Sequence, residues 1–153
     1  MKESHGSEKM NGKYRRCVVD IRSLPSVYRD PQPRRQVRLP LSPYTTGDDR
    51  FLVTHVILAP NGISNGHVHE ESDEIIYFSG PGRVRFDSET YDLAGESLVT
   101  AQRGVWHECI NVSDTQSLTL LCFFVPPFKP FDVFETLIEE TRRHLQNLEA
   151  RCS

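Results

Sequence analysis

The sequence lacks any apolar run long enough to cross a membrane as a helix. Its 153 residues are 37% hydrophobic and 25% charged, and no segment approaches the roughly 18 consecutive apolar residues that a membrane span needs. The N-terminus, MKESHGSEKMNGKYRR, lacks the apolar stretch that follows the charges of a secretory signal peptide. These absences predict a single-domain protein with no membrane partner and a cytoplasmic location.

Cysteine is scarce and shows no metal-binding or redox spacing. The four cysteines are Cys17, Cys109, Cys122 and Cys152, and no two of them form a CxxC pair. Because no signal peptide is expected either, we interpret them as free thiols in a reducing compartment.

Charge is mild overall but unevenly distributed. The net charge is −3, yet eleven of the 18 Lys and Arg residues lie within residues 1–50, whereas 15 of the 21 Asp and Glu residues follow them. A basic arm could contact nucleic acid or fold back on the acidic body of the same chain. No aromatic and basic motif of a nucleic-acid-binding domain accompanies it, so no nucleic-acid partner is expected.

The chain divides into four segments. Residues 1–13 are polar without apolar periodicity and are expected to form a flexible tail. Residues 14–50 include five prolines between Leu24 and Pro43, which predicts an extended, irregular arm that packs on the main domain or on a partner subunit. Residues 51–127 form the expected β domain, and residues 130–150 form the expected C-terminal helix.

The β domain is predicted from many short strands separated by turn signals such as Pro60-Asn61-Gly62. This spacing is typical of an antiparallel sandwich or barrel, and the absence of alternating helices argues against a parallel α/β sheet. One further strand is expected near the N-terminus, at Cys17–Ile21. The predicted strands of the β domain are Phe51–Leu58, Glu74–Phe78, Arg83–Asp87, Thr90–Leu93, Ser97–Thr100, His107–Val112 and Ser117–Val125.

The C-terminal helix is predicted from a regular apolar stripe. Asp132 and Glu135 have the spacing of a capping box, and the stripe that follows has helical spacing. Its members are Phe134, Ile138, Thr141, Leu145 and Leu148. The helix is expected to pack on the outside of the β domain or on a second subunit. Together with the proline-rich arm it favours a homodimer, which a light-scattering mass near 17.6 kDa would refute.

Three histidines and one glutamate form a candidate metal site. His67 and His69 are one residue apart, a spacing that places both imidazoles on one face of a strand. Glu74 follows five residues later, and His107 begins another predicted strand. Such a mixed nitrogen and oxygen set suits a divalent transition metal. If the ion is octahedral, two coordination positions remain open, as a catalytic site requires.

The order of these residues resembles the two motifs of the cupin superfamily over about residues 50–126. The matching positions are Gly62, His67, His69, Glu74 and Gly80, then Gly95, Gly104, His107 and Asn111. The resemblance implies an all-β, single-domain antiparallel barrel of jelly-roll type, followed by the C-terminal helix, with one metal at its centre. It implies the ligands His67, His69, Glu74 and His107. Asn61 and Gln102 depart from the family pattern. These departures affect the expected shape of the pocket entrance and remove none of the implied ligands.

The alternation of side chains along each predicted strand predicts part of the pocket wall. Ile76 and Phe78 share the face of Glu74, and Cys109 shares the face of His107. His55, in an apolar strand, is interpreted as a core or pocket-lining residue rather than a fifth ligand.

Three larger side chains complete the candidate substrate pocket. Arg83 and Arg85 share one face of their strand, where they would bind a carboxylate or phosphate if inside, or be solvated if outside. Trp106 follows Arg103 in the predicted entrance loop and could contact a substrate, a rim or a partner subunit.

These features predict a metal-dependent cupin enzyme for a small aromatic or hydrophobic molecule, most simply an Fe(II) dioxygenase. Mn, Ni, Co or Zn in the same site would instead favour Lewis-acid chemistry, as in a cyclase, isomerase or lyase. A non-catalytic cupin that binds a small molecule is the other alternative. No general acid or base beyond the metal centre is assigned.

Overall fold

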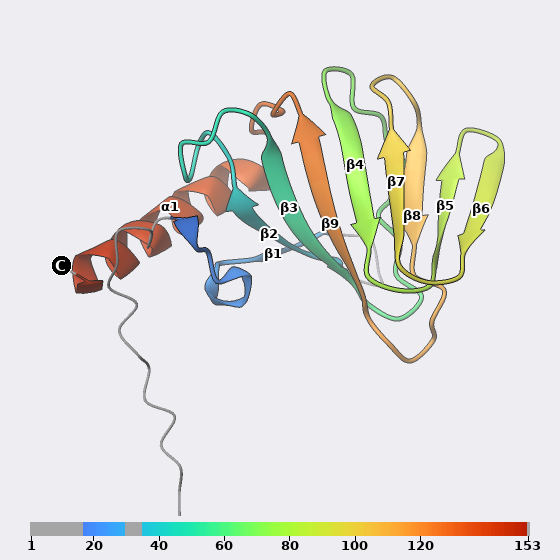
Figure 1. Ribbon diagram of the computed structural model, residues 1–153, viewed down its shortest axis with the longest axis horizontal. Helices are drawn as coiled ribbons and strands as arrows, with labels where there is room; N and C mark the ends of the chain where they lie inside the picture. Colours follow the sequence, from blue (N-terminus) through green and yellow to red (C-terminus); the bar gives the residue numbers. More distant parts are fainter. Residues whose placement is uncertain (1–16, 30–34, 153) are drawn as a thin grey trace, which may run out of the picture.

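The computed structural model describes residues 17–29 and 35–152. Its described part contains a short 3-10 helix at Ile21–Ser23, a series of β-strands and one C-terminal helix (Figure 1). The strands are β1 (Val27–Arg29), β2 (Arg35–Leu41), β3 (Leu52–Leu58), β4 (Asp73–Phe78), β5 (Gly82–Phe86), β6 (Glu89–Leu93), β7 (Ser97–Ala101), β8 (His107–Ile110) and β9 (Leu118–Val125). The helix is α1 (Val133–Cys152).

The strands form two antiparallel sheets. Six strands are ordered β1-β2-β3-β9-β4-β7, and three are ordered β6-β5-β8. Two isolated bridges, Ile63 with Ile110 and His67 with His107, attach the loop before β4 to β8. The predicted antiparallel β fold with a C-terminal helix is confirmed, and its two sheets are consistent with the jelly-roll form.

The predicted strands between residues 51 and 125 are all present, with ends that shift by at most two residues. The prediction of a strand at Cys17–Ile21 is wrong. In its place the chain turns into the 3-10 helix, and the Asp20 side chain accepts a hydrogen bond from the backbone N–H of Arg22 at 3.1 Å. An aspartate that caps a helical turn in this way competes with strand pairing.

The proline-rich segment is an integral part of the larger sheet. Its strand β2 pairs with β3 along most of its length, and β1 pairs with β2 at the sheet edge. Pro40 lies where the β2–β3 register shifts, between Arg38 and Leu41, as expected for a residue with no N–H to donate. The predicted tail at residues 1–13 and part of the predicted arm lie outside the described residues.

The core lies between the sheets and extends under the helix. Phe78 and Leu120 contribute to it from the six-stranded sheet, and Val84 contributes from the three-stranded sheet. Phe134 and Leu137 of α1 join the same cluster. The helix contacts β2, and its Phe134 lies against Arg29 of β1. The two elements predicted as dimer contacts therefore pack against each other within one chain. No helix in the described part is long and apolar enough to cross a membrane.

Candidate metal centre

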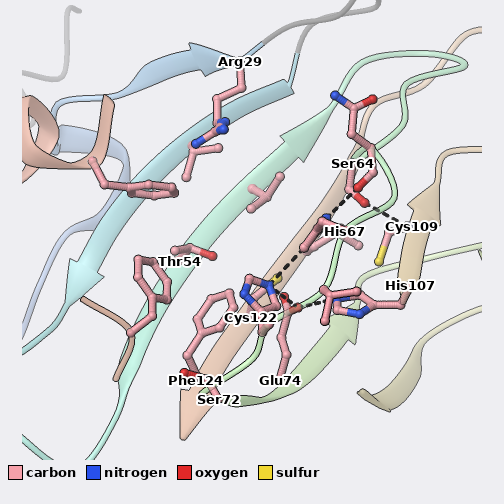
Figure 2. Close-up of a pocket in the computed structure, with 18 of the residues that line it drawn as sticks. Arg29, Thr54, Ser64, His67, Ser72, Glu74, His107, Cys109, Cys122 and Phe124 are labelled. Atoms are coloured by element: carbon pink, nitrogen blue, oxygen red, sulfur yellow. Dashed lines mark hydrogen bonds and ion pairs between the residues drawn. The ribbon is translucent and has the colours of Figure 1, made fainter. Parts of the chain in front are cut away.

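Four side chains from two distant stretches of sequence converge at one point. His67 and His69 come from the loop before β4, Glu74 from β4 itself, and His107 from the start of β8. Their ligand atoms all lie within 4.8 Å of one another. Figure 2 shows His67, Glu74 and His107 on the same wall of a cavity. The structure thus brings together all four predicted ligands.

The spacing of the donor atoms fits one metal ion. His67 Nε2 lies 3.0 Å from His69 Nε2, and Glu74 Oε2 lies 2.7 Å from His107 Nε2 and 3.3 Å from His69 Nε2. Ligand atoms about 2.1 Å from an ion and at right angles to each other are about 3 Å apart. The group can therefore close around a single cation with little movement.

Backbone carbonyls select the tautomer that metal binding requires. His67 Nδ1 lies 2.6 Å from the Asn65 carbonyl oxygen, and His107 Nδ1 lies 3.0 Å from that of Val105. A carbonyl oxygen only accepts, so each Nδ1 carries the proton and donates it. The Nε2 lone pair of neutral His67 then faces the centre of the site, as in most histidine ligands. His107 Nε2 lies 2.7 Å from Glu74 Oε2 and donates a proton to that carboxylate in the metal-free site, so a bound ion would replace this proton.

Burial and hydrogen bonding set the protonation states. Burial alone would raise the pKa of Glu74, but the hydrogen bonds with His107 and His69 hold that pKa at about 2. Burial would lower the pKa of His107, and Glu74 raises it overall. Burial lowers the pKa of His67 to about 4. At neutral pH the site therefore holds an ionised carboxylate and a neutral His67, which are the forms that bind metals.

A cavity of about 590 Å³ opens beside the four ligands, which is a typical volume for a small-molecule site. One side of it is aromatic. The His69 ring lies nearly parallel to Phe128, with centroids 6.4 Å apart, and meets Phe124 edge-on at 4.9 Å. Phe131 and Phe134 continue the same wall. Apolar rings therefore cover the approach to the candidate ligands.

The structure divides the residues predicted for the pocket. Cys109 lines the cavity. Ile76 and Phe78 point inward as expected, but they are fully buried in the core rather than at the cavity wall. His55 lies on the opposite face of β3 from the cavity-lining Thr54, where burial and the charge of nearby arginines lower its pKa.

Arg83, Arg85 and Trp106 also lie outside the cavity. Val84 faces the core, so the alternation of β5 turns both arginines outward, as the solvated alternative proposed. Arg83 pairs with Asp92 at 2.6 Å. Arg85 pairs with Glu108 at 3.1 Å and lies over the Trp106 ring.

The sequence analysis missed two groups of cavity residues. The first is Arg29 and Arg35 on β1 and β2, and the second is the part of the aromatic wall that follows β9, namely Phe128, Phe131 and Phe134. Arg35 and Val37 are two residues apart, so in a strand they share one face. This alternation was present in the sequence, but it lay in a proline-rich segment that was expected to be irregular. The phenylalanines follow the cis peptide bond Val125–Pro126, where the β domain was expected to have ended.

Comparison with known proteins agrees with this geometry. A family model described as a cupin domain matches residues 54–124. Among solved structures, a predicted oxalate decarboxylase from Thermotoga maritima superposes with a TM-score of 0.64 at 18% identity, covering 71% of this chain and 98% of that one. The protein TT1209 from Thermus thermophilus superposes with a TM-score of 0.57 at 25% identity, covering 72% of this chain and 98% of that one.

An RmlC-like cupin from Desulfovibrio desulfuricans gives a TM-score of 0.51 at 17% identity, covering 60% of this chain and 82% of that one. No curated protein is a significant sequence match. These likenesses describe the fold, and at such identities they carry no particular reaction with them.

Proposed function

The chain is a member of the cupin superfamily, with the family match at residues 54–124, and on this premise we propose that it is a metal-dependent enzyme for a small hydrophobic molecule. We favour an Fe(II) dioxygenase acting on an aromatic substrate. The observation that carries this proposal is the convergence of His67, His69, Glu74 and His107 beside a cavity with an aromatic wall.

The ligand set supports a catalytic rather than a structural ion. Four protein donors leave positions free on an octahedral ion, and structural sites are usually closed. Fe(II) bound there would supply oxygen chemistry, and Mn, Ni, Co or Zn would supply Lewis-acid chemistry. The chain itself supplies an ionised Glu74 and the fixed tautomers of His67 and His107. Phe124 and Phe128 exclude water from that side and can orient an aromatic ring.

Elemental analysis of the purified protein tests the metal site. We expect about one equivalent of metal in the wild type, and loss of metal in His67→Ala and His107→Ala. His144→Ala on α1 is the matched control and should keep the metal. A wild type that stays empty after reconstitution with Fe(II), Mn(II), Co(II), Ni(II) and Zn(II) would overturn the proposal and favour a non-catalytic binding protein.

Oxygen consumption then tests the reaction class. The iron-loaded protein should consume oxygen in the presence of at least one member of a panel of catechols, other phenols and aromatic acids. The His107→Ala variant should consume none with the same panel. Iron loading without oxygen consumption across the panel would favour the Lewis-acid alternative. That alternative includes decarboxylase chemistry, for which the Thermotoga maritima protein is named.

A further inference from the structure

Two arginines face each other at one side of the cavity. Arg29 and Arg35 are directly paired across β1 and β2, and both line the cavity. In Figure 2, Arg29 lies across the cavity from Glu74 and His107. Like charges in direct register destabilise a sheet. Burial first, and repulsion by Arg29 second, lower the pKa of Arg35 to about 10. The fold therefore keeps two like charges side by side at one part of a cavity whose lining also includes Glu70, Glu71 and Glu74.

Neither of these two cavity arginines has an acidic partner among the described residues. Arg35 Nη1 donates to the Ser64 carbonyl oxygen, while Arg35 Nε is buried without a hydrogen-bond partner. The Arg29 guanidinium lies over the Phe134 ring, 5.3 Å from its centroid. Among the described residues no carboxylate pairs with either arginine. By contrast, each of four other arginines pairs with an Asp or Glu: Arg50, Arg83, Arg85 and Arg103.

We propose that the cavity binds a monocarboxylic acid with an apolar body, whose carboxylate is held by Arg35 and Arg29 and whose body lies against the phenylalanine wall. The planar guanidinium matches a carboxylate with two parallel hydrogen bonds. Arg35 Nε is buried without a hydrogen-bond partner, so this guanidinium keeps an unused donor. The inference rests on the proposed function, because it names the substrate class of the same site.

The size of the cavity favours an acid larger than acetate or oxalate. Its volume of about 590 Å³ far exceeds the space that acetate or oxalate fills. Arg29 lies across the cavity from Glu74 and His107 (Figure 2). An acid whose carboxylate is held there needs a spacer to reach the metal ligands, and the rings of Phe128 and Phe134 border that space. A phenyl or alkyl chain is the spacer that such a wall stabilises.

Calorimetric titration of the metal-free protein tests this assignment independently of the metal. The probes are phenylacetate, 3-phenylpropionate and hexanoate, with 3-phenylpropionamide as the neutral match and acetate as the acid without an apolar body. We expect at least one of the three larger acids to bind. The amide should bind roughly tenfold more weakly or worse, because a hydrogen bond to a charged group contributes about 1.5–3 kcal/mol. Acetate should also bind more weakly than the larger acids, because it has no apolar body to bury against the phenylalanine wall.

Arginine variants assign the effect to its residues. Arg35→Gln and Arg29→Gln should each reduce affinity for the acid by about 10- to 100-fold and leave the weak amide binding unchanged. Arg83→Gln, on the outer face of β5, is the matched control and should bind the acid as the wild type does. Because Arg35 also holds the Ser64 carbonyl, its variant is checked by thermal melting. If Arg35→Gln does not fold, Arg29→Gln carries the test.

The outcomes separate this inference from the proposed function. Equal affinity for acid and amide, no binding of any of the larger acids, or an acid preference that survives both arginine variants would overturn the inference, even in a protein that binds metal. A protein that takes up no metal but keeps an arginine-dependent acid preference would retain the inference and lose the metalloenzyme proposal.

Discussion

His67 and His107 form a β-bridge in which each backbone N–H donates to the carbonyl oxygen of the other, at 3.1 and 3.0 Å. Their rings lie with centroids 4.7 Å apart. The bridge ties the loop before β4 to the first residue of β8, so the backbone sets the separation of two candidate ligands before any ion binds. Such a preorganised pair reduces the rearrangement that metal binding requires.

Gly66 allows Trp106 to cover this bridge. A Cβ atom at Gly66 would overlap the Trp106 indole, and these residues immediately precede His67 and His107. We therefore predict that Gly66→Ala destabilises the fold by about 1–3 kcal/mol, as overpacking does, and weakens metal binding. Urea unfolding and metal titration measure the two effects. Gly80→Ala, whose added Cβ meets no atom within 4 Å, is the control, and equal stability of the two variants would contradict the explanation.

Asn111 joins the loops at the other end of β8. Its buried side-chain amide donates to the carbonyl oxygens of Ala59 and Gln116 at 2.9 and 2.7 Å, and its Oδ1 accepts from the Ser113 N–H at 3.0 Å. Asn111→Ala leaves these groups unpaired, and we expect a loss of about 1–3 kcal/mol in the free energy of unfolding. Asn147→Ala, at an exposed position of α1, should show no loss. Matching unfolding curves for the two variants would argue against this role.

The metal-free protein should lose stability as the pH falls from 6.5 to about 4. In this interval the unfolded chain protonates His67, whereas burial delays its protonation in the folded chain until about pH 4. The depressed pKa of Glu74 adds a further loss below pH 4.5. The raised pKa of His107 has the opposite sign and contributes stability below pH 6.5.

Comparison with His67→Gln isolates the His67 contribution. The free energy of unfolding, measured by urea titration at stepped pH, should fall less steeply between pH 6.5 and 4 in this variant than in the wild type. Identical slopes would show that His67 is not held neutral by burial.

The cysteines should differ sharply in reactivity. Cys17 is exposed, while Cys109 and Cys122 are buried, and burial raises the pKa of both buried thiols. Only a thiolate reacts rapidly with iodoacetamide. At pH 8 we expect alkylation of Cys17 in the native protein, and of Cys109 and Cys122 only after unfolding in urea. Peptide mass spectrometry distinguishes the sites, and native labelling of Cys109 as fast as Cys17 would contradict the burial described here.

The local pattern of the sequence predicted most of the β domain and the candidate ligands. Strands such as Leu52–Leu58 are apolar, β-branched and bounded by turns, so short-range preferences suffice to locate them. The one-residue spacing of His67 and His69, with Glu74 and His107 in family order, predicted a site that the folded chain brings together. The turn at Ile21–Ser23 was missed because the hydrogen bond of one aspartate outweighed a short apolar run.

The sequence by itself determined the strand order along the chain and the C-terminal helix, because each depends on spacing within a few residues, and the resemblance of its two motifs to the cupin family indicated the candidate ligands. Only the tertiary structure decided which faces form the cavity. The alternation of side chains along β5 predicts that Arg83 and Arg85 share a face. The packing of Val84 into the core turns that face outward. The pairing of β2 with β3 is long-range, and it placed Arg35 inside where local sequence indicated an irregular arm.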